Sequence, residues 1–397
     1  MKPSPMPLPW TLQTVPHAVL DILRGCNIRC RDCFNTQPDR IKSLSEIERE
    51  LDTLLRLRKL QSLSIVGGEI TLHPELVEVV RMVKSRGLFV ELFSNGVDLE
   101  PGMLARLKRA GTDLIFLHIE PQQRRPDLAA NASVEDLRRL RAQKAAQIVA
   151  QGMDAGLAVT VYPDKLEEAA EAIAFTLESP NICCLLITLW RDATRMPPIR
   201  GDLEEGLRAS GESLPDPVGK DRLTNPEVCG PLEEQFRLTP FAFVGSNVDP
   251  LDPRWLSYLV AAVHRNGAPT SLRSLRPTVV ERAFLALTHR IAGRYPFYQA
   301  QSALRFSLHL LFNALAGGGV GNFKPLLAAC RPGAKLTAKK LLFQCAASLD
   351  PQGRLVHCHC CPDAVVRDGK LVPLCVSDKV VSGNGVESRV PVQPGGL

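Results

Sequence analysis

The sequence is poor in aromatic residues and lacks a long uninterrupted apolar run. Aromatic side chains make up only 5% of the 397 residues, which argues against a stacking surface for single-stranded nucleic acid. The least polar stretch, Phe306 to Phe323, contains His309 and Asn313 and is glycine-rich at its end. A membrane-spanning helix needs about 20 predominantly apolar residues. We therefore expect neither nucleic acid as a partner nor a transmembrane segment.

The amino-terminal residues also lack the apolar core of a secretory signal peptide. Prolines occupy positions 3, 5 and 7 after a single basic residue, Lys2, and no apolar segment precedes them. We therefore expect a cytoplasmic protein. Disulfides are rare in that reducing compartment, so clustered cysteines are interpreted first as metal ligands.

The twelve cysteines form two groups. Three lie between Cys26 and Cys33, and five lie between Cys345 and Cys375. The other four are scattered and are interpreted as core residues: Cys183, Cys184, Cys229 and Cys330. The two groups are therefore the candidate metal sites.

Positive charge is concentrated in one segment. The net charge is +6, but residues 254–344 contain 13 Lys or Arg and a single acid, Glu281, so this segment carries +12. It could be an ordinary solvated face, a nucleic-acid contact, or a surface for an anionic lipid or phosphorylated substrate. Two amphipathic stretches, Val279 to Tyr295 and Phe297 to Ala316, favour the last interpretation. A peripheral position at a membrane surface is then an alternative to a purely cytoplasmic one.

Short β-branched segments alternate with long helical patterns over the first 190 residues, which predicts βα units and a parallel sheet. The predicted strands are Ala18 to Leu23, Leu63 to Val66, Leu88 to Phe93, Asp113 to Ile119, Leu157 to Tyr162 and Ile182 to Leu189. The predicted helices are Leu44 to Leu60, Pro74 to Arg86, Pro101 to Ala110, Val134 to Ala155 and Leu166 to Leu177. Six such strands with right-handed crossovers form a partial (β/α)6 barrel.

Several residues predict the ends of these helices. Ser43 and Glu46 are spaced as a capping box, and Ser133 is a predicted N-cap. Gly111 and Gly156 each follow a predicted helix closely, where a left-handed C-cap is expected.

The whole chain is expected to have five parts. They are an N-terminal tail (1–15), the barrel (16–200), a variable connection with a basic helical region (201–340), a small cysteine-rich module (341–380) and a C-terminal tail (381–397).

The first cysteine group, Cys26, Cys30 and Cys33, follows the first predicted strand. Three closely spaced thiolates can hold three corners of a 4Fe-4S cluster and leave the fourth iron open. A structural zinc site normally has four ligands. His17 could supply a fourth ligand, so a zinc site is the alternative.

This Cys-x-x-x-Cys-x-x-Cys spacing resembles that of the radical S-adenosylmethionine (SAM) superfamily, and the resemblance continues to about residue 190. It implies that the open iron binds SAM. It also implies that the reduced cluster cleaves SAM to methionine and a 5′-deoxyadenosyl radical, which abstracts a hydrogen atom. Such an enzyme needs a reducing partner such as ferredoxin or flavodoxin.

The second predicted strand ends in a segment that resembles the superfamily's GGE motif. Gly67 and Gly68 allow the backbone to approach a ligand closely, and the carboxylate of Glu69 can accept a hydrogen bond from the SAM ammonium. Ile70 stands where the superfamily usually has proline.

The third and fourth predicted strands end in further segments of this kind. Ser94, Asn95 and Gly96 resemble the segment that reaches the SAM ribose and methionine carboxylate. Glu120 stands where related enzymes carry a residue facing the ribose, and a solvated loop carboxylate is the alternative. The carboxyl ends of such strands share one barrel face, where barrels build active sites.

Adenine recognition departs from the superfamily pattern. The residue before the third cysteine is usually hydrophobic or aromatic, but it is Asp32 in this chain. Phe34 is the candidate that takes its place.

The second cysteine group resembles the auxiliary-cluster modules appended to many radical SAM enzymes. The expected ligands of a second 4Fe-4S cluster are Cys345, Cys358, Cys361 and Cys375, with Cys360 as the spare cysteine. Two histidines in the same stretch, His357 and His359, make a tetrahedral zinc site the alternative.

Two short segments resemble the superfamily branch related to pterin methylation and tetraether lipid coupling, His118 to Pro126 and Asp368 to Cys375. This resemblance implies C–H activation followed by methylation or C–C coupling of a lipid or other anionic small molecule. A peptide-modifying radical enzyme is the alternative, and a non-catalytic iron-sulfur scaffold or redox sensor is an alternative of another class. The intact GGE and Ser94–Gly96 segments argue against a scaffold, which has no need of a SAM pocket.

Overall fold

The computed structural model describes residues 5–33, 35, 40–192, 196, 199, 222–296, 302–350 and 353–380. Phe34 and the predicted C-terminal tail (381–397) lie outside the described residues. Most residues between 193 and 221, at the start of the predicted variable connection, also lie outside them.

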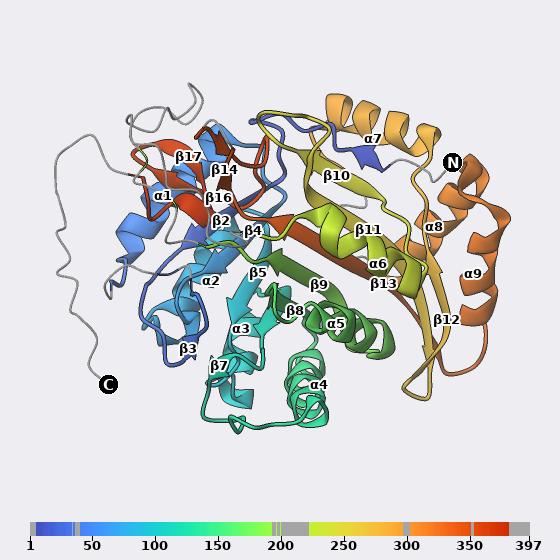
Figure 1. Ribbon diagram of the computed structural model, residues 1–397, viewed down its shortest axis with the longest axis horizontal. Coiled ribbons are helices and arrows are strands. Elements are labelled where there is room, and N and C mark those ends of the chain that lie inside the picture. Colours follow the sequence, from blue (N-terminus) through green and yellow to red (C-terminus); the bar gives the residue numbers. More distant parts are fainter. Residues whose placement is uncertain are drawn as a thin grey trace.

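Six parallel strands form the centre of the fold and pair in the order β2-β4-β5-β6-β8-β9. Their bounds are His17–Asp21 (β2), Ser62–Val66 (β4), Phe89–Ser94 (β5), Leu114–His118 (β6), Asp154–Val161 (β8) and Ile182–Leu189 (β9). The connecting helices are Leu44–Leu57 (α1), Leu76–Ser85 (α2), Pro101–Ala110 (α3), Val134–Ala150 (α4) and Glu167–Glu178 (α5). Figure 1 shows this alternation of strand and helix along the chain. The predicted α/β class with a partial (β/α)6 barrel is confirmed.

Local sequence signals explain where several helices begin and end. Ser43 caps α1 through the predicted capping box, and Ser133 caps α4 as predicted. Gly111 ends α3 with φ 111°, the left-handed conformation expected of a glycine C-cap. Gly156 lies inside β8 instead, where a Cβ atom would be only 2.7 Å from the ring of Phe116. The C-cap prediction for Gly156 is therefore wrong, because close packing in the sheet explains this glycine.

The sheet continues beyond β9 with strands that the sequence pattern did not predict. They are β13 (Ala334–Cys345), parallel to β9, then β11 (Pro253–Arg265) and its neighbours β10 (Ala242–Gly245) and β12 (Ala268–Ser274). β1 (Met6–Pro7), from the predicted N-terminal tail, pairs with β10. The prediction of a helical region over 201–340 is wrong for these strands. An apolar run such as Leu259 to Val263 fits a buried strand or a buried helix equally, because no polar residue reveals its period.

Helices and two short turns pack beside this extension of the sheet. They are α7 (Val279–Ala292), α8 (Ala303–Asn313), the π-helical turn η3 (Ala314–Gly318), the 3₁₀ turn η4 (Val320–Asn322) and α9 (Phe323–Ala329), here called the α7–α9 layer. Phe306 and Leu310 of α8 pack with Leu259 and Val263 of β11 in a second core. A further helix, α6 (Asn225–Phe236), packs against β11 and β13. The two predicted amphipathic stretches thus contain α7 and α8.

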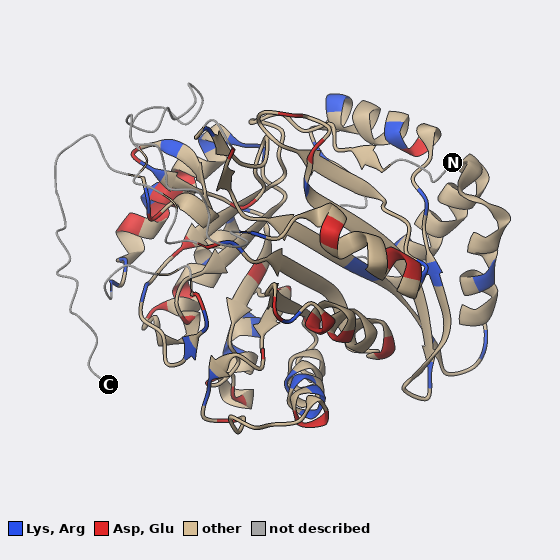
Figure 2. Ribbon diagram, viewed as in Figure 1, with Lys and Arg blue, Asp and Glu red and all other residues tan. Residues whose placement is uncertain are grey.

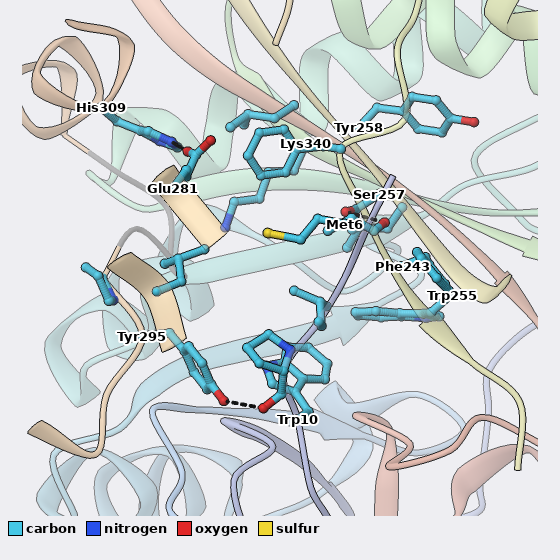
Figure 3. A pocket seen from close by; sticks show the side chains of 18 residues that line it. Met6, Trp10, Phe243, Trp255, Ser257, Tyr258, Glu281, Tyr295, His309 and Lys340 are labelled. Carbon is cyan, nitrogen blue, oxygen red and sulfur yellow. Dashed lines mark hydrogen bonds and ion pairs between the residues drawn. The ribbon is translucent and has the colours of Figure 1, made fainter. Parts of the chain in front are cut away.

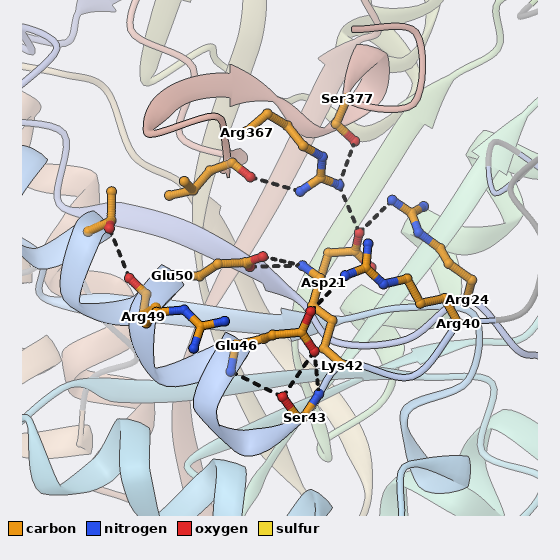
Figure 4. Close-up of polar contacts among 12 residues, drawn as sticks. Asp21, Arg24, Arg40, Lys42, Ser43, Glu46, Arg49, Glu50, Arg367 and Ser377 are labelled. Atoms are coloured by element: carbon orange, nitrogen blue, oxygen red, sulfur yellow. Dashed lines mark hydrogen bonds and ion pairs between the residues drawn. The ribbon is translucent and has the colours of Figure 1, made fainter. Parts of the chain in front are cut away.

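The cysteine-rich end of the chain folds as a small module against β2. It consists of β14 (Ser348–Leu349), β15 (Leu355–Val356), β16 (Ala364–Arg367), β17 (Lys370–Pro373) and the 3₁₀ turn η5 (Leu374–Val376). Asp21 joins the module to the barrel, because its Oδ2 accepts from Arg24 at 2.6 Å and from Arg367 at 3.1 Å (Figure 4). Val365 packs with Val19 of β2.

Candidate functional site

The loop that carries the first three cysteines, here called the cysteine loop (residues 24–33), lies over the carboxyl ends of the barrel strands. The backbone after β4 holds the start of this loop: Gly68 donates its N–H to the O atom of Leu23, just before the loop, at 3.0 Å, and Glu69 donates to Gly25 O at 2.8 Å. A Cβ atom at Gly68 would be 2.1 Å from Gly25 O. At Gly67 it would be 2.6 Å from Leu23 O. Both glycines therefore allow the backbone to approach the cysteine loop.

Side chains from three other strand ends anchor the rest of the cysteine loop. Asn95, after β5, donates its Nδ2 hydrogen to Asn27 Oδ1 at 2.7 Å. Tyr162, after β8, donates its hydroxyl to Arg31 O at 2.7 Å. Trp190, after β9, donates its indole N–H to Asp32 at 2.9 Å.

A short strand pair completes this anchoring. β3 (Arg29–Cys30) pairs antiparallel with β7 (Gln123–Arg124), which follows β6. The carboxyl ends of β4, β5, β6, β8 and β9 thus all contribute to holding the cysteine loop.

The three thiols of the cysteine loop are free and reachable. Cys26 and Cys33 are exposed and Cys30 is half-buried. In the described part of the chain, no three His, Cys, Asp or Glu side chains converge as they would around one metal ion. A zinc ion needs ligands at about 2.0–2.3 Å, whereas a 4Fe-4S cube takes one thiolate at each of three irons. Three free and accessible thiols are therefore available as ligands at this end of the barrel.

Electrostatic coupling shows that the three thiols are neighbours. Although Cys26 is exposed, nearby protein atoms desolvate its thiol and raise its pKa, and Glu69, Cys30 and Cys33 add to the rise. Burial also raises the pKa of Cys33, with Cys30 contributing. A metal held by these thiols would therefore have to displace their protons.

His17, the alternative fourth zinc ligand, is not available to this group. Its Nδ1 is 2.7 Å from Ser62 Oγ, and its Nε2 is 3.1 Å from Ser64 Oγ. Burial and the Arg58 charge lower the pKa of His17 to about 3. His17 is the first residue of β2, and the cysteine loop follows the other end of that strand. The zinc alternative that used His17 is therefore wrong.

Glu69 is fully buried and bonded to the protein. Its Oε1 accepts from the Thr71 N–H at 3.1 Å, the Thr71 hydroxyl at 2.8 Å and the Ser94 hydroxyl at 2.8 Å. Its Oε2 accepts from the Asn95 N–H at 2.7 Å. Burial raises the pKa of Glu69 despite these bonds. A carboxylate offers about four acceptor positions, so a ligand ammonium could use the remaining position on Oε2.

The segment Ser94–Gly96 is held in place by a buried arginine. Arg125 donates an N–H to Asn95 O at 2.9 Å and pairs with Asp127 at 2.6 Å. Gly96 has φ 78°, and its N–H donates to Ser94 Oγ at 3.0 Å. The predicted pocket residues of β4 and β5 thus form one connected network beside Cys26, whose Sγ is 3.9 Å from Asn95 Nδ2.

Glu120 is buried, with 2% of its surface exposed. It accepts hydrogen bonds from His118 at 2.9 Å and from the backbone N–H of Thr160. The alternative of a solvated loop carboxylate is therefore wrong. Burial would lower the pKa of His118, but Glu120 and Cys30 together raise it well above its usual value. Cys30, His118 and Glu120 therefore form a chain of polar contacts from the cysteine loop into the barrel end.

Three residues of this site were not predicted from the sequence. Tyr162 is the last residue of one predicted strand and Trp190 directly follows another, so the rule that barrel sites gather at the carboxyl ends of strands could have found them. Trp190 brings an aromatic ring to Asp32, the position where the superfamily pattern expects an apolar residue. No sequence pattern pointed to Arg125, because an arginine in a loop is normally exposed to solvent.

The second cysteine group is only partly brought together. The Cys358 and Cys361 thiols share a hydrogen bond that raises the pKa of Cys361, with burial adding to the rise. Burial and Cys361 raise the pKa of Cys375, although Arg191 opposes the rise. These three cysteines therefore lie within electrostatic reach of one another.

Cys345 and Cys360 have other neighbours. Cys345 packs in the main core together with Cys229, and burial raises its pKa to about 11. Cys360 has φ 57° and places its Sγ 3.7 Å from Trp10 O. The zinc alternative involves His357, whose Nδ1 is 2.9 Å from Cys358 O.

A separate apolar cavity of about 140 Å³ lies between the sheet extension and the α7–α9 layer (Figure 3). Aromatic side chains from four segments line it: Trp10, Phe243, Trp255, Tyr258 and Tyr295. Its charged lining residues are Glu281 and Lys340. The predicted cluster and SAM residues do not line it.

A parallel barrel whose strand ends jointly hold a three-cysteine loop defines this protein as an α/β barrel with a thiol-based site. Residues 20–150 match the family model described as the Radical SAM superfamily.

Curated relatives match parts of the chain. The tungsten-containing aldehyde ferredoxin oxidoreductase cofactor-modifying protein of Pyrococcus furiosus is 30% identical over 105 residues, 25% of this chain and 30% of that protein. The PqqA peptide cyclase of Ruegeria pomeroyi is 27% identical over 210 residues, 49% of this chain and 54% of that protein. The chain thus spans about a third to a half of these relatives' lengths.

Solved structures resemble part of the fold. Streptococcus suis SuiB bound to S-adenosylmethionine has 15% identity and a TM-score of 0.38, covering 57% of this chain and 47% of that chain. Methylornithine synthase (PylB) has 14% identity and a TM-score of 0.32, covering 43% of this chain and 52% of that chain.

None of the helices in the described residues combines the length and the apolar character needed to cross a membrane.

Proposed function

We propose that this chain is a radical SAM enzyme that holds a 4Fe-4S cluster through Cys26, Cys30 and Cys33. The observation that carries this proposal is the anchoring of the cysteine loop by the GGE and Ser94–Gly96 segments, through Gly68, Glu69 and Asn95. When bound and reduced, the cluster supplies the electron that cleaves SAM to methionine and a 5′-deoxyadenosyl radical.

The chain's own residues bind and orient SAM in this proposal. The free acceptor position of Glu69 Oε2 takes a hydrogen of the SAM ammonium, because a buried carboxylate favours a charged donor. Ser94, Asn95 and Gly96 face the ribose and the methionine carboxylate. Glu120 is preset near the ribose by the N–H of Thr160. Phe34, or Trp190 beside Asp32, packs on the adenine.

The proposed substrate is a lipid or another anionic small molecule, activated at a C–H bond for methylation or C–C coupling. The basic segment and the apolar cavity support a substrate with an anionic end and an apolar part. A peptide is the second candidate, and similarity to the PqqA peptide cyclase of Ruegeria pomeroyi favours it. A ferredoxin or flavodoxin is the proposed electron donor, and a cytoplasmic or peripheral membrane position is the proposed location.

We also propose a second 4Fe-4S cluster in the C-terminal module, held by Cys345, Cys358, Cys361 and Cys375. The mutual proximity of three of these cysteines supports it. A zinc ion in the same module is the alternative.

Anaerobic reduction of the reconstituted protein with SAM tests the main proposal. We expect 5′-deoxyadenosine from the wild type and none after replacement of Cys26, Cys30 and Cys33 by Ala. Cys330→Ala is a matched control, because Cys330 is an exposed cysteine outside both groups. Continued 5′-deoxyadenosine formation by the triple variant would disprove the assignment. Deuterium transfer from labelled lipids or peptides into 5′-deoxyadenosine then distinguishes the two substrate classes.

A further inference from the structure

Exposed apolar side chains gather on the α7–α9 layer. Of the 18 large apolar residues that are exposed in the described part of the chain, ten lie between positions 279 and 327. The six most exposed of these ten, at 70% to 83%, are Val279, Ile291, Leu304, Leu315, Val320 and Leu327. Single exposed apolar residues are ordinary on a protein surface, but ten within one layer indicate a binding surface.

These residues belong to elements that pack on one another. α7 contacts η3, and α8 contacts η3, η4 and α9. The rings of Phe284 in α7 and Phe312 in α8 have centroids 5.2 Å apart. α8 buries Phe306 and Leu310 against β11 while Leu304 and Leu308 face outward. A helix that is apolar on both faces requires a second apolar environment beyond its own core.

The exposed charge around these residues is entirely positive. Residues 275–333 contain seven Lys or Arg and one acid, Glu281. Glu281 is 1% exposed and accepts from His309 Nε2 at 2.5 Å and from Asn313 Nδ2 at 2.8 Å. Arg290 and Lys324 are exposed. Figure 2 shows blue segments along α7 and α9.

We propose that the α7–α9 layer docks on the surface of a lipid bilayer that contains anionic lipids. Apolar side chains of such a layer enter the boundary of the acyl region, and its cations pair with the headgroups. A second copy of this chain fits less well, because two copies of the layer would bring cations against cations. The cavity under α7 agrees with a lipid partner, because Leu285 of α7 lines a space large enough for a short apolar segment.

This inference rests on the proposed function, because a lipid substrate would give the enzyme a reason to bind a membrane. Vesicle binding can nevertheless be measured without SAM or reductant. The two proposals can therefore fail separately: a protein that cleaves SAM can fail to bind vesicles, and the reverse.

Cosedimentation with vesicles tests the proposal. The purified full chain is mixed with vesicles of phosphatidylcholine alone or of phosphatidylcholine with phosphatidylglycerol. We expect binding to the anionic vesicles, weak binding to the neutral ones, and loss of binding in high salt. Failure of the wild type to bind anionic vesicles would overturn the proposal.

Two variants separate the apolar from the charged contribution. Ile291→Ser with Leu304→Ser removes apolar contacts, and Arg290→Gln with Arg294→Gln and Arg305→Gln removes charge. Each should reduce the bound fraction at least tenfold. The matched control is Leu251→Ser, which changes a residue 78% exposed outside the layer and should bind as the wild type does.

Sedimentation velocity without lipid examines the competing partner. We expect the wild type and the Ile291→Ser/Leu304→Ser variant to sediment alike, as one species. A wild-type dimer that this variant dissociates would assign the face to a second copy and overturn the membrane proposal. Circular dichroism of each variant verifies that its fold is intact.

Discussion

Glu69 accepts the backbone N–H of Asn95 at 2.7 Å, which joins the end of β4 to the end of β5. The same glutamate donates its own backbone N–H to Gly25 O in the cysteine loop at 2.8 Å. One residue therefore holds the cysteine loop with its backbone and the neighbouring strand end with its side chain. A change at Glu69 should affect both the proposed SAM pocket and the fold around it.

Glu69→Gln should weaken SAM binding and lower the melting temperature. The amide has one acceptor oxygen, so it cannot serve both the Thr71/Ser94 donors and the Asn95 N–H, and an unsatisfied buried group costs about 1–3 kcal/mol. Isothermal titration with SAM and thermal unfolding measure the two effects. Iron bound by the cysteine loop should persist, because all three thiols remain. Unchanged SAM affinity would remove Glu69 from the site.

Gly68→Ala should displace the cysteine loop and reduce iron binding. The added Cβ would meet Gly25 O at 2.1 Å, a contact that only backbone movement can relieve. Iron and sulfide content after anaerobic reconstitution, with the absorbance of the cluster, measures the loss. Gly102→Ala in α3 is the matched control, because its Cβ would meet no atom within 4 Å. Full iron content in Gly68→Ala would show that the loop does not depend on this approach.

Glu91→Gln should stabilise the protein above neutral pH. Burial in the barrel raises the pKa of Glu91 to about 7, and the nearby charges of Asp363 and Asp113 add to the rise. A hydrogen bond from Ser64 and the charge of Lys340 oppose it. Between about pH 4.5 and 7 the unfolded chain ionises this group while the folded chain keeps it protonated. Stability is therefore lost as pH rises through this window, by up to about 3 kcal/mol.

Melting temperatures of Glu91→Gln and the wild type, compared at about pH 5 and about pH 8.5, measure this effect. The stabilisation should be larger at the higher pH. Glu135→Gln, on the exposed surface of α4, controls for the removal of one charge. An equal shift of Glu91→Gln at both pH values would contradict the expectation.

The C-terminal module should bind iron independently of the cysteine loop. With Cys26, Cys30 and Cys33 replaced by Ala, the anaerobically purified protein should retain about four irons per chain. Further replacement of Cys358 and Cys361 should eliminate them. About one zinc and no iron-sulfur absorbance in the triple variant would make the module a structural zinc site instead.

The fourth ligand of the module can be identified by the same measurement. In the triple variant, adding Cys345→Ala should lose the iron, whereas adding Cys360→Ala should keep it, because Cys360 lies against Trp10 O. The opposite result would exchange the roles of these two cysteines.

The barrel could be predicted from the sequence because its signals are local. Its strands are short apolar runs, and a helix follows each of the first five in the sequence. Ser43 and Gly111 mark helix ends through their own backbone preferences. The position of the GGE segment next to the cysteine loop follows from topology, since parallel strands bring their carboxyl ends to one edge.

The sheet extension could not be predicted in the same way. β13 joins β9 only after about 145 intervening residues, and nothing in either strand's sequence specifies the other as its partner. The sequence also did not indicate which charged residues are buried. Lys339, counted in the basic segment, is fully buried and donates to Ser179 O at 2.5 Å. Such contacts depend on tertiary packing, which overrides the preference of lysine for solvent.

The ion pair between Asp21 and Arg367 joins residues 346 positions apart, so the order of synthesis affects how the barrel is completed. β2 emerges from the ribosome long before β16, which lies against it. At ~5–20 residues per second, the interval is about 20–70 s. During that time the face of β2 that Val365 covers stays exposed, and exposed apolar surface makes an unfinished chain prone to aggregate. A chaperone that shields nascent chains should therefore increase the yield of this protein more than that of a barrel closed by its own neighbouring strands.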